Sequence, residues 1–297
     1  MVQIFVNSLV WGAELGLVAL GLSLCYKVLR FANFAQVEYV MVGAVAVYWL
    51  TTGAAVPLAI AALVALLFTG LSAMFVHRIT FSHVRGGSEF SLMLASVGVG
   101  MAIRGLVQML SGGSVRTLSA SGFLKTSYHF LGARISSLQI LVILVTAATM
   151  VLLHFLLSYT KIGIAFRATA NNPRLAEARG IDVESITFLM WFMAGCLAAL
   201  SGILIGLETQ VSPRMGWQLL LPSFAAATLG GLGNMYGAVA GGVAVALIEN
   251  LILAVNIGPV LGEEMILIPT GYKPAISFLL IIIALLFRPK GLLGGEE

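Results

Sequence analysis

Four charged residues occur inside long apolar runs of this sequence: Glu14, Glu38, Arg104 and Glu249. A charge at membrane depth is costly, so such a group generally faces a cavity or a partner of opposite charge. One interpretation is an internal ion pair, for example Arg104 with Glu38 or with Glu249, that fixes the register of the helices. The other is a polar lining for a solute pathway. The two interpretations are compatible, because a pathway wall also needs fixed polar groups.

The segment from Arg30 to Glu38 adds further polar groups to this set. Asn33 is a good N-cap, so we expect a helix to begin there and to carry Gln36 and Glu38 into the membrane. A helix start exposes backbone N–H groups and a partial positive charge, which suits a solute that bears a carboxylate. We place the following residues along the pathway, with the glycines allowing close backbone approach: Asn33, Gln36, Glu38, Ser96, Arg104, Gly230, Gly231, Gly233 and Glu249.

Motifs of the common enzyme classes are missing from the sequence. No Gly-Lys dipeptide occurs, so the chain has no P-loop and does not bind ATP in that way. The four histidines show no metal-ligand spacing, and no GxSxG motif supplies a nucleophile. Cys25 and Cys196 lie in apolar runs, which predicts neither a disulfide framework nor a metal site. We therefore predict no catalytic residue, no metal and no cofactor in this chain.

The composition, 60% hydrophobic and 9% charged, is typical of an integral membrane protein. A spanning helix needs about 20 mostly apolar residues. We predict an all-α polytopic bundle of eight or nine transmembrane helices in one domain, residues 1–297. The run 216–233 is short and contains Pro222, so it is a candidate for a re-entrant or broken helix. The apolar runs are 4–25, 33–50, 56–76, 90–110, 138–157, 186–207, 216–233, 237–257 and 273–287.

The Lys and Arg residues predict the orientation of the chain. With the N-terminus outside and the C-terminus inside, the inner loops hold twice as many basic residues as the outer loops, as the positive-inside rule requires. The net charge of +4 reflects this bias and implies no nucleic-acid partner. The first apolar run lacks a preceding basic residue and a cleavage site, so it is a transmembrane helix rather than a signal peptide. The largest outer loop, 111–137, is long enough only for a cap.

The segment 158–185 is the most hydrophilic part of the chain. It holds seven charged residues, basic and acidic together, of a total of 16 basic and 12 acidic residues in the chain. Such a segment lies in water, and its basic excess places it in the cytoplasm. Asn172 as N-cap, Pro173 at the first helical position and Gly180 after the last turn predict a short helix, Pro173–Arg179. A capped helix on a membrane domain is a contact point for a cytoplasmic partner. The alternative is a solvated connector.

Glycines at intervals of four residues predict tight helix packing. Gly233, Gly237 and Gly241 form one such ridge, and two further pairs are Gly12 with Gly16 and Gly202 with Gly206. Helices in lipid gain little from apolar contact with each other, so small residues that let backbones approach are a main source of packing. We interpret these glycines as structural.

At four segments the sequence resembles the permease subunits of bacterial branched-chain amino-acid ABC importers, specifically the LivH type. The resemblance runs through nearly the whole chain. Asn33, Phe34, Ala35 and Glu38 match the family's Asn-Phe-Ala-His-Gly-Glu element, with departures at Gln36 and Val37, and Pro222 stands where a Lys is expected. The segments are GLSLCYKVLRFANFAQVEYVMVGA (21–44), TKIGIAFRATANNPRLAEARGI (160–181), FAAATLGGLGNMYGAVAGGVAVALIEN (224–250) and YKPAISFLLIIIALLFRPKGLLG (272–294), whose tail runs from Pro289 to Gly294.

The resemblance implies a permease of the bacterial cytoplasmic (inner) membrane that acts with a second homologous permease (LivM type). Two cytoplasmic ATPase subunits would bind ATP and Mg, and an extracytoplasmic binding protein would deliver the solute. It also favours ATPase docking by the 158–185 loop, through Arg167, Arg174, Leu175, Ala176, Arg179 and Gly180.

The sparsely polar pathway suits a branched-chain or other hydrophobic amino acid. Relatives implied by the resemblance move urea, short amides or aromatic carboxylates, and these remain alternative solutes. An autonomous secondary transporter or channel is the alternative class of protein, since it would work alone on an ion gradient or on downhill flux.

Overall fold

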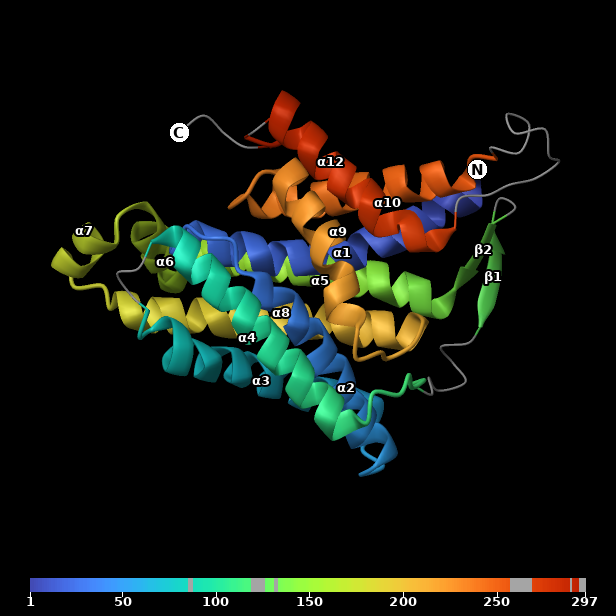
Figure 1. Cartoon of the computed structure of the whole chain (residues 1–297), viewed down its shortest axis with the longest axis horizontal. Coiled ribbons are helices and arrows are strands. Elements are labelled where there is room, and N and C mark those ends of the chain that lie inside the picture. Colours follow the sequence, from blue (N-terminus) through green and yellow to red (C-terminus); the bar gives the residue numbers. More distant parts are fainter. Residues whose placement is uncertain (85–87, 119–125, 131–132, 257–268, 289, 294–297) are drawn as a thin grey trace.

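The computed structural model describes residues 1–84, 88–118, 126–130, 133–256, 269–288 and 290–293, and its described elements form a bundle of long helices (Figure 1). Pro289 and Gly294, which bound the C-terminal tail of the resemblance, and part of the cap expected at 111–137 lie outside these residues. The helices are α1 (Val2–Leu29), α2 (Glu38–Thr52), α3 (Leu58–Val76), α4 (Glu89–Ser111), α5 (Ser137–Tyr159), α6 (Lys161–Asn171), α7 (Pro173–Ala178), α8 (Val183–Glu208), α9 (Met215–Gly230), α10 (Met235–Ala254) and α12 (Lys273–Phe287).

Eight helices of the described chain are long and apolar enough to cross a membrane, which confirms the predicted polytopic all-α class. The ninth apolar run forms α9, a continuous helix of 16 residues with Pro222 inside it. It is therefore not broken at the proline. At about 1.5 Å per residue it is roughly 24 Å long, less than the roughly 30 Å of a bilayer core.

Helix α1 lies at the centre of the bundle and packs against α8, α9 and α10. Close backbone approach at glycine makes this packing possible, as predicted. A Cβ atom added at Gly12 would lie 2.6 Å from the Cα of Val243 on α10, and one at Gly202 of α8 would overlap the carbonyl oxygen of Val40 on α2. By contrast α3, α4, α5 and α12 expose much of their apolar surface, as helices facing lipid or another subunit do.

The described residues also contain a small two-stranded antiparallel sheet, β1 (Ser127–Phe130) with β2 (Ala133–Ser136), which the apolar pattern did not predict. It lies within the loop expected to form a cap, at the end of the bundle where α1 begins (Figure 1). Helices α6 and α7 lie at the opposite end. The two long hydrophilic segments of the chain therefore mark opposite ends of the bundle.

Candidate functional site

The chain turns into the bundle between α1 and α2. Arg30 adopts the left-handed conformation (φ 59°) and ends α1, and Asn33 then caps a 3₁₀ turn, Phe34–Val37. The side-chain oxygen of Asn33 accepts a hydrogen bond from the backbone N–H of Ala35, 3.1 Å away. This turn leads directly into α2, so that its first residue, Glu38, is already buried. The predicted helix start at Asn33 is confirmed.

Glu38 forms an ion pair with Arg104 of α4. The Nε of Arg104 donates to Oε1 of Glu38 at 3.2 Å, and Nη2 donates to the same oxygen. The carboxylate is 1% exposed and the guanidinium side chain 19%. The guanidinium carbon lies 4.6 Å from the ring centroid of Trp217 on α9, a cation–π contact. The sequence offered Glu38 or Glu249 as the partner of Arg104, and the structure pairs it with Glu38.

One oxygen of the Glu38 carboxylate, Oε2, is buried and has no hydrogen-bond partner among the described residues. Gly216 at the start of α9 faces it, since a Cβ atom there would lie 2.7 Å from this oxygen. A buried carboxylate oxygen without a donor is costly, because desolvation is not compensated. The position is therefore a place where a hydrogen-bond donor would be stabilised.

Ser96 of α4 fixes the 3₁₀ turn beside this pair. Its hydroxyl accepts from the backbone N–H of Phe34 at 3.0 Å and donates to the carbonyl oxygen of Met93 at 2.6 Å. The Phe34 ring stacks on Phe224 of α9, with centroids 4.8 Å apart. This aromatic contact joins the 3₁₀ turn to α9, the helix that also supplies Trp217 to the ion pair.

Gln36 is fully buried and contacts α8 rather than α4. Its Nε2 donates to the carbonyl oxygen of Ala194 at 2.8 Å, and the thiol of Cys25 donates to its Oε1 at 3.8 Å. Gly21 gives it room, because a Cβ atom there would lie 2.5 Å from Nε2. These contacts tie the 3₁₀ turn to α1 and α8. Its predicted place on the pathway stays a prediction.

Glu249 lies in a separate polar group formed by α1, α10 and α12. The indole Nε1 of Trp11 donates to its Oε2 at 2.9 Å, and the hydroxyl of Ser277 donates to its Oε1. The ammonium of Lys273 lies 4.8 Å from the Trp11 ring centroid. A cavity of about 540 Å³ opens here, lined by Trp11 and Lys273 together with Gln218 and Pro222 of α9.

The glycines at 230–233 form the turn between α9 and α10. Gly231 and Gly233 have φ values of 105° and 87°, a region that other residues rarely adopt. A Cβ atom at Gly230 would overlap the carbonyl oxygen of Gly237. At Gly230 the backbone of α9 thus approaches that of α10, whereas a Cβ atom at Gly233 would come no closer than 3.8 Å to Lys27. A role in the pathway stays a prediction.

The predicted pathway residues therefore fall into three places. Asn33, Glu38, Ser96 and Arg104 lie together where the 3₁₀ turn, α2, α4 and α9 meet, with Gln36 beside them on the α8 side. Glu249 and the glycine turn are elsewhere. Sequence reasoning missed Trp217 and Trp11. The signal was present, because a tryptophan is a good partner for a cation. In the described residues no three His, Cys, Asp or Glu side chains converge as metal ligands.

The 158–185 segment folds into two helices. Helix α6 follows α5 after Thr160, whose hydroxyl accepts from the N–H of Gly163, and was not predicted. Helix α7 begins as predicted, with Asn172 accepting from the N–H of Leu175 at 3.1 Å and Pro173 at its first turn. Gly180 follows it with φ 80°, as expected for the residue after a helix. The predicted short helix is confirmed, with its end at Ala178.

The residues that we expected on one docking surface differ in how far they are exposed to solvent. Arg167, Arg174 and Arg179 are exposed, and Leu175 is an exposed leucine (56%). Ala176 is buried (3%) and faces the chain's own turn, where its carbonyl oxygen accepts from the N–H of Ile181 at 3.0 Å. A partner approaching α7 would meet Leu175 before Ala176.

The start of α8 anchors this segment. Asp182 caps the helix through hydrogen bonds from the backbone N–H groups of Glu184 and Ser185 and from the hydroxyl of Ser185, 2.6 Å away. The side-chain hydrogen bond from Ser185 holds the pKa of Asp182 below its usual range. Arg78 pairs with Glu184 at 2.7 Å. Local hydrogen bonds therefore order both ends of the connection between α7 and α8.

Comparison with known proteins shows similarity to permeases along nearly the whole chain. Residues 4–285 match the family model described as branched-chain amino acid transport system / permease component. The chain is 30% identical to the high-affinity branched-chain amino acid transport system permease protein BraD of Pseudomonas aeruginosa, covering 99% of this chain and 96% of that protein. It is 26% identical to LivH of Escherichia coli, over 98% and 94% of the two chains. A probable LivH of Methanocaldococcus jannaschii is 28% identical, over 98% and 92%.

Proposed function

Because this chain belongs to the family of branched-chain amino acid transport system permease components, we propose that it moves branched-chain or other hydrophobic amino acids across the inner membrane. It is a permease subunit of an ABC importer. In the proposed assembly it pairs with a second homologous permease of the LivM type. An extracytoplasmic binding protein delivers the solute, and two cytoplasmic ATPases bind ATP and Mg and hydrolyse the ATP. The match over residues 4–285 is the observation that carries the proposal.

The Glu38–Arg104 pair supports an amino acid as the solute. An amino acid has a carboxylate and an ammonium group, and a guanidinium binds a carboxylate well. Oε2 of Glu38 lacks a donor among the described residues and is suited to an ammonium group. Phe34, Phe224 and Trp217 provide apolar surface for a hydrocarbon side chain. In this proposal Arg104 pairs with the solute's carboxylate and Glu38 with its ammonium group as the solute passes. The solute's charges then take the place of the ion pair between Glu38 and Arg104.

Helix α7 supports coupling to an ATPase. Leu175 is an exposed leucine on a short helix with Arg174 and Arg179 exposed close by, which fits a partner surface with an apolar pocket and acidic groups. A capped helix transmits motion without bending. The proposal places this end of the bundle in the cytoplasm, in agreement with the Lys and Arg bias. The N-terminus is then outside and the C-terminus inside.

The test is reconstitution in liposomes with defined components. The full assembly, with binding protein and ATP, is expected to accumulate leucine or valine, and the chain without ATPases is expected to accumulate neither. Uptake by the chain alone would overturn the proposal in favour of an autonomous transporter or channel. Uptake of urea, a short amide or an aromatic carboxylate is measured in the same way to identify the solute class. ATP-dependent accumulation of one of these in place of leucine and valine would retain the importer and replace the solute.

A further inference from the structure

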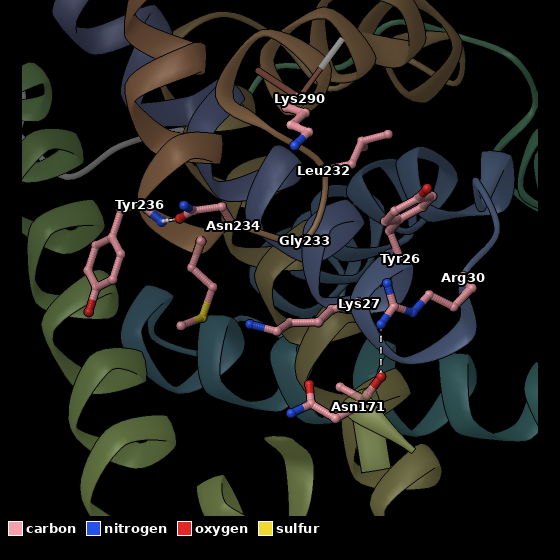
Figure 2. A pocket seen from close by; sticks show the side chains of 11 residues that line it. Tyr26, Lys27, Arg30, Asn171, Leu232, Gly233, Asn234, Tyr236 and Lys290 are labelled. Carbon is pink, nitrogen blue, oxygen red and sulfur yellow. Dashed lines mark hydrogen bonds between the residues drawn. The ribbon is translucent and has the colours of Figure 1, made fainter. Parts of the chain in front are cut away.

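A cavity of about 550 Å³ opens where α1 ends and α10 begins (Figure 2). Its walls are the end of α1, the end of α6, the turn between α9 and α10, and the segment after α12. Lys27, Arg30 and Lys290 line it, and none of the described lining residues is acidic. None of the side chains that contact the Glu38–Arg104 pair lines it. The cavity is therefore a basic site apart from the ion pair of the proposed pathway.

Among the described residues no carboxylate pairs with the cations of this cavity. Within the described chain the ion pairs are Arg78–Glu184 and Arg104–Glu38, so the three cations of the cavity have no acidic partner there. Arg30 is held in place, since its Nη2 donates to the carbonyl oxygen of Ala170 at 3.1 Å. The first turn of α10 adds a partial positive charge, and the end of α1 adds a partial negative charge. Counted over the described lining residues, three full positive charges remain in excess.

The basic cavity continues toward a helix with an exposed apolar face. A smaller cavity of about 110 Å³ shares Lys27 and Tyr236 with it and reaches Arg167 and the end of α5. The Tyr236 hydroxyl hydrogen-bonds to His154 of α5, with ring centroids 5.8 Å apart. Further exposed apolar residues of α5 extend from there, namely Val151, Leu152, Phe155 and Tyr159. A polar recess thus joins an apolar surface at the end of a spanning helix.

We propose that the basic cavity binds the phosphate of an anionic phospholipid whose acyl chains lie along the exposed face of α5. Basic pockets between transmembrane helices bind anionic headgroups, and tyrosines mark the level of the headgroups in membrane proteins. Tyr26 and Tyr236 line this cavity. A soluble anion or an acidic protein segment would use the cations but not the apolar surface that adjoins them. A phospholipid uses both.

The test is lipid retention by the full-length chain, purified in detergent and measured by native mass spectrometry after mixing with phosphatidylglycerol or phosphatidylcholine. We expect wild type to retain one phosphatidylglycerol in preference to phosphatidylcholine. Lys27→Gln with Lys290→Gln should weaken retention about 25-fold, since each basic group contributes roughly fivefold. Lys27→Arg with Lys290→Arg keeps the charge and should restore retention. Arg78→Gln with Arg179→Gln removes the same charge from exposed positions outside the cavity and should retain the lipid.

Three outcomes would overturn the proposal. Equal retention of the two lipids would mean that the phosphate charge is not recognised. An equal loss in the cavity variant and in the Arg78/Arg179 control would mean that general surface charge is responsible. Displacement of the lipid by millimolar inorganic phosphate, or by the purified ATPases, would assign the cavity to a soluble anion or to protein carboxylates. A thermal melt of each variant in detergent checks that all are folded.

Discussion

At the scale of single residues, three of the four intramembrane charges, Glu38, Arg104 and Glu249, lie in two different environments, while Glu14 is buried without an ion-pair partner among the described residues. Glu38 and Arg104 neutralise each other beside Trp217, and one carboxylate oxygen of Glu38 has no donor in the described chain. Glu249 instead accepts one hydrogen bond at each of its oxygens, from Trp11 and Ser277. A carboxylate whose oxygens are both hydrogen-bonded by the protein is suited to holding helices together. The partly satisfied carboxylate of Glu38 is better suited to a passing ligand.

Glu38→Gln leaves the shape of the side chain and removes its charge, so Arg104 loses its counter-ion. We expect leucine uptake by the reconstituted assembly to fall more than tenfold, with a raised KM for the solute delivered by the binding protein. Removing one member of a buried pair costs about 3–5 kcal/mol of stability, so the assembly is compared by thermal melting as well. A purely structural role would lower the melting temperature and the maximal rate while leaving KM unchanged.

At the scale of elements, glycine decides how closely α2 and α8 approach. Gly202→Ala gains about 1 kcal/mol of helix propensity, but its Cβ would overlap the Val40 carbonyl. Overpacking of this kind costs about 1–3 kcal/mol, so we expect a lower melting temperature in detergent. Gly98→Ala on α4 is the matched control, because nothing lies within 4 Å of a Cβ atom there. Equal melting temperatures for the two variants would show that α2 and α8 do not pack in this way.

Helix α7 is the element expected to contact the ATPases. Leu175→Asp places a charge on its exposed face and should reduce ATPase co-purification and coupled uptake at least tenfold without changing the melting temperature. Val115→Asp is the control, an exposed apolar residue (54%) near the opposite end, and should leave co-purification unchanged. Normal coupling in Leu175→Asp would contradict the docking assignment. Ala176→Asp discriminates less well, because Ala176 is buried in the chain's own fold.

At the scale of the whole molecule, the two hydrophilic ends of the bundle must lie on opposite sides of the membrane. We expect an impermeant maleimide to label Val115→Cys on intact cells, and to label Leu175→Cys only after the membrane is opened. Wild type gives the background, since Cys25 is buried and Cys196 half-buried within spanning helices. The opposite pattern would reverse the orientation and remove α7 from the cytoplasm, and with it the proposed contact to the ATPases.

Local chemistry let the sequence alone predict several features. Apolar runs long enough to span a bilayer predicted the helices, because backbone polar groups in lipid must be satisfied within a helix. Asn33, and Asn172 with Pro173 and Gly180, predicted helix ends, because a cap depends on hydrogen bonds within a few residues. The glycine pairs predicted close helix contacts. These features need no knowledge of which helices are neighbours.

Only the tertiary structure decided which distant residues meet. Glu38 and Glu249 are both acids in apolar runs, and nothing in their local sequence selects one as the partner of Arg104. The packing of α2 beside α4 makes that choice, while α10 lies against α1 and α9 and holds Glu249 near Trp11. The inward side of α7 and the basic cavity likewise depend on contacts between segments far apart in the chain. Helix packing in lipid is selected by fit between surfaces, and that fit is a property of pairs of helices rather than of any one of them.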